Sequence, residues 1–508
     1  MARIKNKKEK IFGPVSVIIM LIFGIAILSF LVSILGIESH KTVIANGTLE
    51  STLISVRNLF SLNGIKFFIG NAITNFTKFE PLALIIIVSI GIGICEKSGI
   101  IYHMVSPFKK IKFSVLIYFT FIAGVIFSFI GDYSYVLLIP LVGVIYKDIS
   151  KNPMIGIITV YLGLTIGYGT GLIFNYNDYV LGNLTQAAAS LEIDKTYGFG
   201  LFSNIYIMIV STLILSFFGT IVIEKFIVPK FKKKYNYEEE EVIISKKALS
   251  VTMIVSLILW LIVIYMLLPI KLPGAGILLD QSSERYMDKL FGTKSAFREG
   301  ILVIITIVMM VSSYVYGKIS GNIKTSNEYS LGLSKNLENL GFMFVLLFFT
   351  SQMLSILDWT NLGQFVCGKI VEIIGNFQFS GVLLIIAFII GTILSSILLP
   401  DTVAKWELMS PTLIPLFMRS NITPDFAQFI FKVSDGIGKC FTPLFVYFII
   451  MLAFLEKYRV DEKKQISIFG TLKAILPTVL ILTFIWILII CLWYLIGIPI
   501  GVSTMSTL

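Results

Sequence analysis

Apolar segments long enough to cross a lipid bilayer recur along the whole chain. A membrane-spanning helix needs about 20 consecutive apolar residues, and runs of that length alternate here with short polar stretches. Of the 508 residues, 56% are hydrophobic and only 14% are charged, whereas soluble domains carry roughly 25% charged residues. The long runs exclude an outer-membrane barrel, whose strands are short and alternate in polarity. We therefore predict an all-α, polytopic membrane protein.

Nine transmembrane helices and two re-entrant hairpins account for these segments. The predicted crossings are residues 12–35, 115–146, 153–174, 205–227, 248–269, 299–316, 382–417, 426–455 and 472–496. The hairpins have polar tips at 71–81 and 358–363. Such tips are tolerated at membrane depth only inside protein or beside a water-filled cavity.

The order hairpin, broken helix, full helix occurs twice. The broken helices share the sequence LIPL, at 138–141 and 413–416. Five predicted crossings separate equivalent points, so the repeats have opposite orientations. Inverted repeats with broken helices are typical of secondary transporters, which bind substrate where the breaks meet. We predict one domain, with a first repeat at about 55–175, scaffold spans at about 205–317 and a second repeat at about 335–455.

The net charge of +11 fits Lys and Arg in cytoplasmic loops better than a nucleic-acid partner. The N-terminal residues and the loop at 230–247 are predicted to be cytoplasmic. Nothing resembles a nucleophile or metal site, so we predict no enzyme and no cofactor other than a coupling Na⁺ or H⁺. The four cysteines lack metal-site spacing and are predicted to be free thiols.

Charged residues interrupt the apolar helices between residues 392 and 447. The first interruption comprises Pro400, Asp401, Lys405, Trp406 and Glu407. In the next helix Lys432, Asp435 and Lys439 have the spacing i, i+3, i+7 and share one face. Charges at membrane depth are costly and mark substrate or ion pathways. Asp435 is therefore a candidate coupling acid, and Lys432 is a candidate to bind an anionic group of the substrate. The alternative is that these residues form a structural ion pair between helices.

Other candidates have equally plain alternatives. Asp132 and Asp401 lie at the two helix breaks, where they either serve a coupled ion or only cap the half-helices. Trp406 either stacks on an aromatic substrate or packs in the core. Asn75 and Asn361, at the hairpin tips, either contact substrate or only form turns.

Several motifs, in order between Ser55 and Tyr458, resemble the AbgT family of p-aminobenzoyl-glutamate transporters. They are NAITNFTKFEP at 71–81, GIGICEKSG at 91–99, YVLLIPL at 135–141, Gln352, WTNLG at 359–363, AKW at 404–406 and TPL at 442–444. The resemblance implies a homodimer in a bacterial cytoplasmic membrane, with nine spans and two hairpins, driven by an ion-motive force. Activities in the family are uptake of p-aminobenzoyl-glutamate and export of sulfonamide-type antimetabolites. The functional residues of the family map onto Asp178, Trp406, Pro424, Asp435 and Pro443.

Four positions depart from the family pattern. Val403 replaces a serine, Lys432 an arginine, Lys439 an asparagine and Gly171 a second asparagine. Lys offers an anionic substrate a point charge instead of a bidentate grip. If the ammonium of Lys439 occupies the place of a bound Na⁺, transport will be independent of Na⁺.

We therefore predict a proton- or sodium-driven secondary transporter for a small aromatic carboxylate such as p-aminobenzoyl-glutamate. The alternatives are an efflux pump for sulfonamide-type compounds on the same scaffold, and an ion channel.

Overall fold

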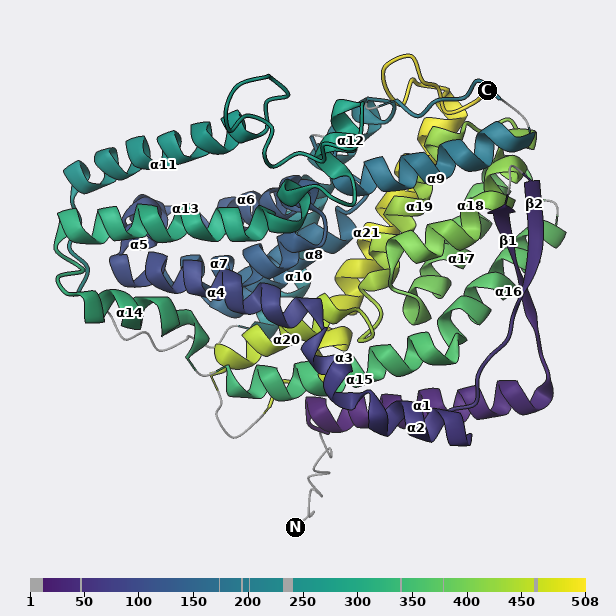
Figure 1. Cartoon of the computed structure of the whole chain (residues 1–508), viewed down its shortest axis with the longest axis horizontal. Coiled ribbons are helices and arrows are strands. Elements are labelled where there is room, and N and C mark those ends of the chain that lie inside the picture. Colours follow the sequence, from purple (N-terminus) through teal and green to yellow (C-terminus); the bar gives the residue numbers. More distant parts are fainter. Residues whose placement is uncertain are drawn as a thin grey trace, which may run out of the picture.

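Helices make up nearly all of the regular structure of the chain, and many of them run roughly along its long axis while others cross it obliquely (Figure 1). The computed structural model describes residues 12–45, 48–172, 174–192, 195–200, 202–231, 241–338, 340–377, 379–460 and 465–508. The basic N-terminal decapeptide and half of the charged loop at 230–247 lie outside these residues, and their predicted cytoplasmic location stays a prediction.

A β-hairpin follows the first helix, α1 (Pro14–Leu35). Its strands, β1 (Ser39–Ala45) and β2 (Thr48–Ile54), pair antiparallel with Ser39 opposite Ile54. It stands at the end of the molecule opposite α11 (Figure 1) and packs on α16 and α18. Hydropathy gave no signal for it, because both strands are mainly polar and its partner helices lie more than 300 residues away.

The two predicted polar tips are places where helices end and restart. The first lies between α2 (Leu62–Gly70), α3 (Ala72–Thr77) and α4 (Glu80–Ser98), and the second between α15 (Gly341–Thr360) and α16 (Leu362–Asn376). The two hairpins contact each other: the Asn75 amide of the first tip donates to Oε1 of Gln352 in α15 at 3.2 Å, and the Gln352 amide donates to the Ala72 carbonyl at 2.9 Å. The Phe67 and Trp359 rings stack at 5.2 Å.

The two broken helices are confirmed. The first is α6 (Phe113–Phe127), a 3-10 turn at Ser128–Ile130 and α7 (Tyr133–Asp148); the second is α17 (Gly381–Leu398) and α18 (Thr402–Arg419). Gly131 adopts φ 64° and ψ −142° at the first break, a conformation open almost only to glycine. Asp401 is the N-cap of α18.

Each repeat continues into a second interrupted helix. In the first repeat α8 (Pro153–Ile166) ends at the glycine-rich segment 167–171, before α9 (Tyr176–Glu192). In the second, α19 (Pro424–Lys439) ends before Pro443, and α20 (Val446–Lys457) follows. The sequence predicted one continuous span at each place. Glycine and proline destabilise helix interiors, and every residue of α8 and α19 is buried, so neither has to match the bilayer by its own length.

The repeats pack on each other reciprocally. Within them α6 lies on α8 and α17 on α19; between them α9 lies on α18 and α20 on α7. The last helix of each repeat, α9 or α20, thus packs on the helix that follows the break in the other repeat, α18 or α7. This exchange places the two breaks, at Gly131–Asp132 and Pro400–Asp401, in one central region.

The remaining helices frame this bundle. They are α5 (Ile100–Val105), α10 (Ile205–Phe226), α11 (Lys246–Met266), α12 (Tyr286–Phe291), α13 (Ala296–Ser320), α14 (Ser326–Ser334) and α21 (Ile468–Ile496), with 3-10 turns at Ser106–Lys110, Val228–Phe231 and Lys335–Leu337. On α11 only Ala248 and Thr252 are buried, and its exposed side chains are largely apolar. Such a helix is stable in lipid and not in water.

Nine helices of the described part are long and apolar enough to cross a membrane, as predicted. They are Pro14–Leu35, Ala72–Ser98, Phe113–Ile130, Ile205–Phe226, Lys246–Met266, Ala296–Ser320, Gly341–Thr360, Gly381–Leu398 and Ile468–Ile496. The set differs from the predicted crossings in two places. It includes Ala72–Ser98 and Gly341–Thr360, which belong to the hairpins, and it omits the segments of α8 and of α19 with α20.

Candidate functional site

A cavity of about 470 Å³ lies where the helix breaks of the two repeats meet. This volume is typical of sites for small molecules. Its wall is formed by Glu80, Phe129, Ile130, Gly131, Asp132, Tyr133, Tyr168, Phe174, Tyr176, Asn177, Leu290, Phe291, Phe297, Arg298, Ile301, Asp401, Thr402, Val403 and Tyr447. Aromatic rings from several elements face it, and charged groups lie among them. The arrangement suits a compound with an aromatic ring and polar ends.

The chain breaks explain why polar groups reach this depth. α7 begins beside the cavity after Gly131, and α18 begins there after Asp401. The first backbone N–H groups of a helix have no partner within it and carry partial positive charge. The carboxylate of Asp401 accepts one of them, from Ala404, at 2.9 Å. The alternative role for Asp401, capping a half-helix, is therefore present in the structure.

Asp132 holds the matching place in the first repeat without capping its helix. It precedes α7, but its side chain makes no capping hydrogen bond. Its Oδ1 atom is buried and has no hydrogen-bond partner among the described residues. A buried carboxylate oxygen without a donor is costly. Asp132 as a whole is partly exposed and lines the cavity, so its carboxylate is available to a ligand there.

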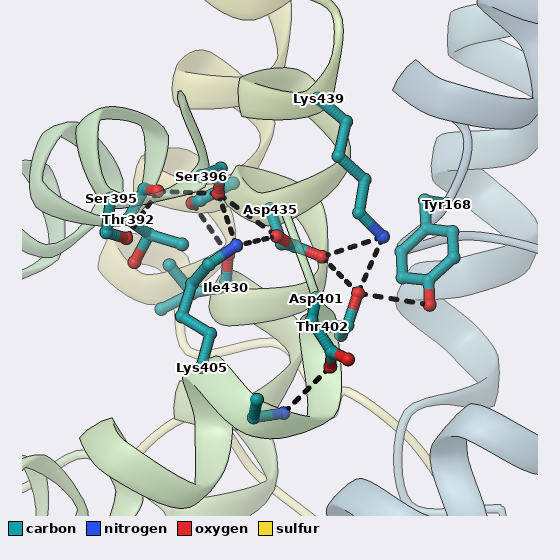
Figure 2. Close-up of polar contacts among 12 residues, drawn as sticks. Tyr168, Thr392, Ser395, Ser396, Asp401, Thr402, Lys405, Ile430, Asp435 and Lys439 are labelled. Carbon is teal, nitrogen blue, oxygen red and sulfur yellow. Dashed lines mark hydrogen bonds and ion pairs between the residues drawn. The ribbon is translucent and has the colours of Figure 1, made fainter. Parts of the chain in front are cut away.

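Asp435 is the centre of a buried ion cluster next to the cavity (Figure 2). It forms ion pairs with Lys405 of α18 on one side and with Lys439 of its own helix on the other, the latter at 3.2 Å. The hydroxyls of Ser396 and Thr402 donate to its two oxygens at 3.0 and 2.5 Å. Asp435 and Lys405 are 0% exposed and Lys439 is 1% exposed, so no bulk water screens these charges.

The cluster contains more positive than negative charge. Two ammonium groups contact a single carboxylate, while Lys439 also lies 4.3 Å from the Tyr168 ring and 5.0 Å from that of Phe445. Aromatic faces attract cations and partly offset the loss of water. Thr402 joins the cluster to the cavity, because it lines the cavity, receives a 2.6 Å hydrogen bond from Lys439 and donates to Asp435.

Asp178 forms a second buried ion pair, with Lys432. Asp178 lies in the first turn of α9, and its Oδ2 accepts the Asn175 backbone N–H at 3.1 Å. Lys432 thus points to the first repeat, away from Asp435, although both residues belong to α19. The pair connects the two repeats, which was the structural alternative to anion binding by Lys432.

Trp406 lies in the core beside the cluster. It is 0% exposed, stacks on Phe431 with ring centroids 4.4 Å apart, and donates its indole N–H to Thr185 at 2.9 Å. It does not line the cavity. In this structure Trp406 therefore packs in the core, which was the alternative to stacking on the substrate.

The remaining predicted residues also lie away from the cavity wall. Asn75 bonds Gln352 as described, while Asn361 adopts φ 57° between α15 and α16 and donates to the Ser55 carbonyl at 3.3 Å. Pro424 opens α19 and Pro443 lies in the break after it. These four shape turns and helix ends in this structure, and their part in substrate binding stays a prediction.

Sequence reasoning missed several residues of the site, among them Lys405 of the ion cluster and Arg298 of the cavity wall. Lys405 was noted only as a charge that interrupts a helix, and Arg298 was not singled out, because it lies just before the predicted crossing at 299–316. Lys405 carried a usable signal, because a lysine four residues after a helix break and next to a tryptophan faces the interior. Arg298 had none, because its approach to the cavity depends on the packing of α13 against distant segments.

Comparison with known proteins gives the chain its family. The model of the AbgT putative transporter family matches residues 1–508. The p-aminobenzoyl-glutamate transport protein of Escherichia coli (strain K12) is 25% identical over 498 residues, which cover 97% of this chain and 94% of that protein.

Two solved structures are also similar. The YdaH transporter of Alcanivorax borkumensis, described as having an unusual topology, gives a TM-score of 0.49 at 23% identity and covers 97% of this chain and 100% of its own. MtrF of Neisseria gonorrhoeae, described within a class of antimetabolite efflux pumps, gives a TM-score of 0.49 at 23% identity, with 98% of both chains covered. The match of the family model to the whole chain, together with its multi-pass helical fold, shows that this protein is a membrane transporter of the AbgT family.

Proposed function

We propose that the protein is a secondary active transporter that carries p-aminobenzoyl-glutamate, or a similar small aromatic carboxylate, across a bacterial cytoplasmic membrane. The observation that carries this proposal is the aromatic-lined cavity at the meeting point of the two helix breaks. A relative at 25% identity is named as a transporter of this compound. The cavity volume and its mixed aromatic and charged wall suit a ligand of that size and chemistry.

The proposed mechanism couples occupation of the cavity to the buried cluster at Asp435. Thr402 contributes to both, so movement of the first turn of α18 changes the contacts of Asp435 and Lys439. In transporters built from two repeats, one repeat can rock against the other around the central site and expose the cavity alternately to the two sides of the membrane. A change of charge in the cluster then shifts the balance between these two states.

We propose that the coupling ion is H⁺ and that no Na⁺ binds at Asp435. Both oxygens of this carboxylate already contact an ammonium group. A Na⁺ ion about 4 Å from an ammonium is repelled by about 4 kcal/mol at an effective dielectric constant of about 20. A lysine ammonium can release its proton when its surroundings become less favourable for charge.

Transport in proteoliposomes tests the function and the ion separately. Labelled p-aminobenzoyl-glutamate should enter against its gradient when a pH gradient is imposed, and replacement of Na⁺ by choline at constant pH gradient should leave uptake unchanged. Loss of uptake in choline would overturn the proposal of H⁺ coupling but not the proposal that p-aminobenzoyl-glutamate is the substrate. No uptake under any gradient, in either ion, would overturn the substrate.

Two alternatives use the same scaffold. Export of sulfonamide-type antimetabolites is possible because a carrier is reversible, and a competition assay with such compounds reports it. An ion channel would conduct continuously and would show no counterflow, so accumulation of labelled compound against unlabelled compound inside the vesicles excludes it. We also propose a homodimer, which the mass of the purified protein in detergent tests.

A further inference from the structure

Four charged side chains line the cavity: Glu80, Asp132, Arg298 and Asp401. Two of them have partners. Glu80 accepts a hydrogen bond from the Tyr133 hydroxyl at 3.3 Å, and Asp401 caps α18. The other two, Arg298 and Asp132, form no ion pair with any residue that the structure describes. The cavity thus contains one uncommitted cation and one uncommitted anion.

No ion pair with a described residue accounts for the position of Arg298. It lies in the first turn of α13, where the helix dipole disfavours a positive charge. Its guanidinium lies over the ring of Tyr176, 4.7 Å from the centroid. The nearby lysines are not comparable, because Lys405, Lys432 and Lys439 all have carboxylate partners.

A guanidinium held against an aromatic face is well suited to an aromatic anion. The stacked ring limits the motion of the side chain, and its free N–H groups can bind a carboxylate in a bidentate manner. Lys432 was the sequence-based candidate for this role, but its ammonium is engaged by Asp178.

Asp132 complements Arg298. Asp132 lines the cavity, and its buried Oδ1 accepts no hydrogen bond from the described residues. An amine or other N–H group of a ligand would satisfy it, and a ligand that lacks a donor would leave it unsatisfied. Sites built to bind a polar group discriminate strongly against analogues that lack the group.

We propose that Arg298 and Asp132 determine substrate specificity: Arg298 binds a carboxylate of the aromatic compound and Asp132 accepts a hydrogen bond from its amine. This inference rests on the proposed function, since it assigns the polar ends of the proposed ligand. It places carboxylate recognition on the scaffold helix α13 and amine recognition at the break of the first repeat.

Binding of three probes to the purified full-length chain, measured by isothermal titration in detergent, tests the assignment. The probes are p-aminobenzoyl-glutamate, benzoyl-glutamate, which lacks the amine, and p-aminobenzamide, which lacks the glutamate carboxylates. The unmodified chain should bind the first probe about tenfold or more tighter than either of the others, because hydrogen bonds to charged groups are strong.

Each variant should remove one preference only. Arg298→Gln should weaken p-aminobenzoyl-glutamate and benzoyl-glutamate about tenfold or more and leave p-aminobenzamide unchanged. Asp132→Asn should remove the preference for p-aminobenzoyl-glutamate over benzoyl-glutamate. Arg285→Gln is the matched control, because Arg285 is exposed and lies outside the cavity wall; it should change nothing.

The outcomes separate this inference from the proposed function. Failure of the unmodified chain to bind any probe overturns the proposed function and this inference with it. Tight binding of p-aminobenzoyl-glutamate that neither variant alters, or equal weakening of all three probes, overturns the inference alone. Should a variant not fold, equal binding of the three probes by the unmodified chain still overturns the inference.

Discussion

The two buried aspartates between the repeats, Asp178 and Asp435, differ in the number of lysines that they contact. Asp178 pairs with one lysine, Lys432, and the charges balance. Asp435 contacts two lysines, Lys405 and Lys439, and the charges do not balance. The residues of both sites are nearly or completely shielded from water, so the difference lies in charge and not in exposure.

This contrast separates two uses of a buried ion pair. A neutral pair across two helices holds them together and has no reason to change its protonation. A buried cluster with an extra cation has a high electrostatic free energy. The loss of a proton or the approach of an anion lowers this free energy. The Asp178 site therefore has the features of a structural ion pair that links the repeats, and the Asp435 site has those of a coupling centre.

Removal of the Asp435 charge should have the largest effect. Asp435→Asn leaves two ammonium groups buried without a carboxylate, and breaking a buried pair costs about 3–5 kcal/mol. We expect uptake of p-aminobenzoyl-glutamate in proteoliposomes to fall at least about a hundredfold, because the carboxylate proposed to carry the coupling is gone. Asp425→Asn on the same helix is the control, because an amide oxygen can still accept the Tyr197 hydroxyl that donates to Asp425 at 2.9 Å. Uptake above a tenth of normal would show that the cluster is not the coupling centre.

The ion pair between Asp178 and Lys432 should contribute to stability and not to transport. Asp178→Asn alone leaves Lys432 buried and unpaired, so we expect a clear fall in the thermal unfolding midpoint in detergent. The double variant Asp178→Asn with Lys432→Met removes both charges and should recover most of that stability, since apolar replacement of a buried pair is often neutral. If the double variant is stable but inactive in transport, the two sites share a function and the contrast fails.

Lys439→Asn should convert the charged cluster into a balanced one. It leaves Lys405 as the sole partner of Asp435 and adds an amide oxygen, a ligand type that suits Na⁺. We expect uptake to become stimulated several-fold by Na⁺, against choline at the same pH gradient, with the unmodified chain measured in parallel. Uptake that stays indifferent to Na⁺ in a folded Lys439→Asn protein would show that Lys439 does not exclude the ion.

Trp406→Phe should have the smallest effect on transport. Trp406 bonds Thr185 of α9, and the Thr185 hydroxyl donates to Gln428 of α19 at 2.6 Å, so the indole links the helices that hold the two acids. Because it does not line the cavity, we expect less than about a threefold change in KM, with a loss of stability on the order of 1 kcal/mol for one hydrogen bond. A large rise in KM would show that the ring reaches the substrate.

The architecture was largely predictable because its signals are local. Span-length apolar runs, the polar tips, and the glycines, prolines and acids at the breaks all act within about one helix turn of themselves. They predicted the all-α class, seven of the nine long apolar helices of the described residues and both broken helices. The two additional breaks, after Ile166 and after Lys439, carried the same glycine and proline signals but lay inside runs apolar enough to be interpreted as single spans.

The site was predictable only in part. The shared face of Lys432, Asp435 and Lys439 follows from helical spacing, and all three are buried as their cost at membrane depth implied. Their partners do not follow from spacing: Lys432 pairs with Asp178, 254 residues away, and Asp435 with Lys405, 30 residues away.

The sequence by itself thus determined which segments are helices in lipid, where they break, and which charges are too costly to be incidental. Only the tertiary structure decided which of those charges neutralise each other, that Trp406 is enclosed in the core, and that Arg298 and Asp132 are left open to the cavity. The reason is physical: helix formation and burial depend on neighbours along the chain, whereas charge pairing depends on how separate helices cross.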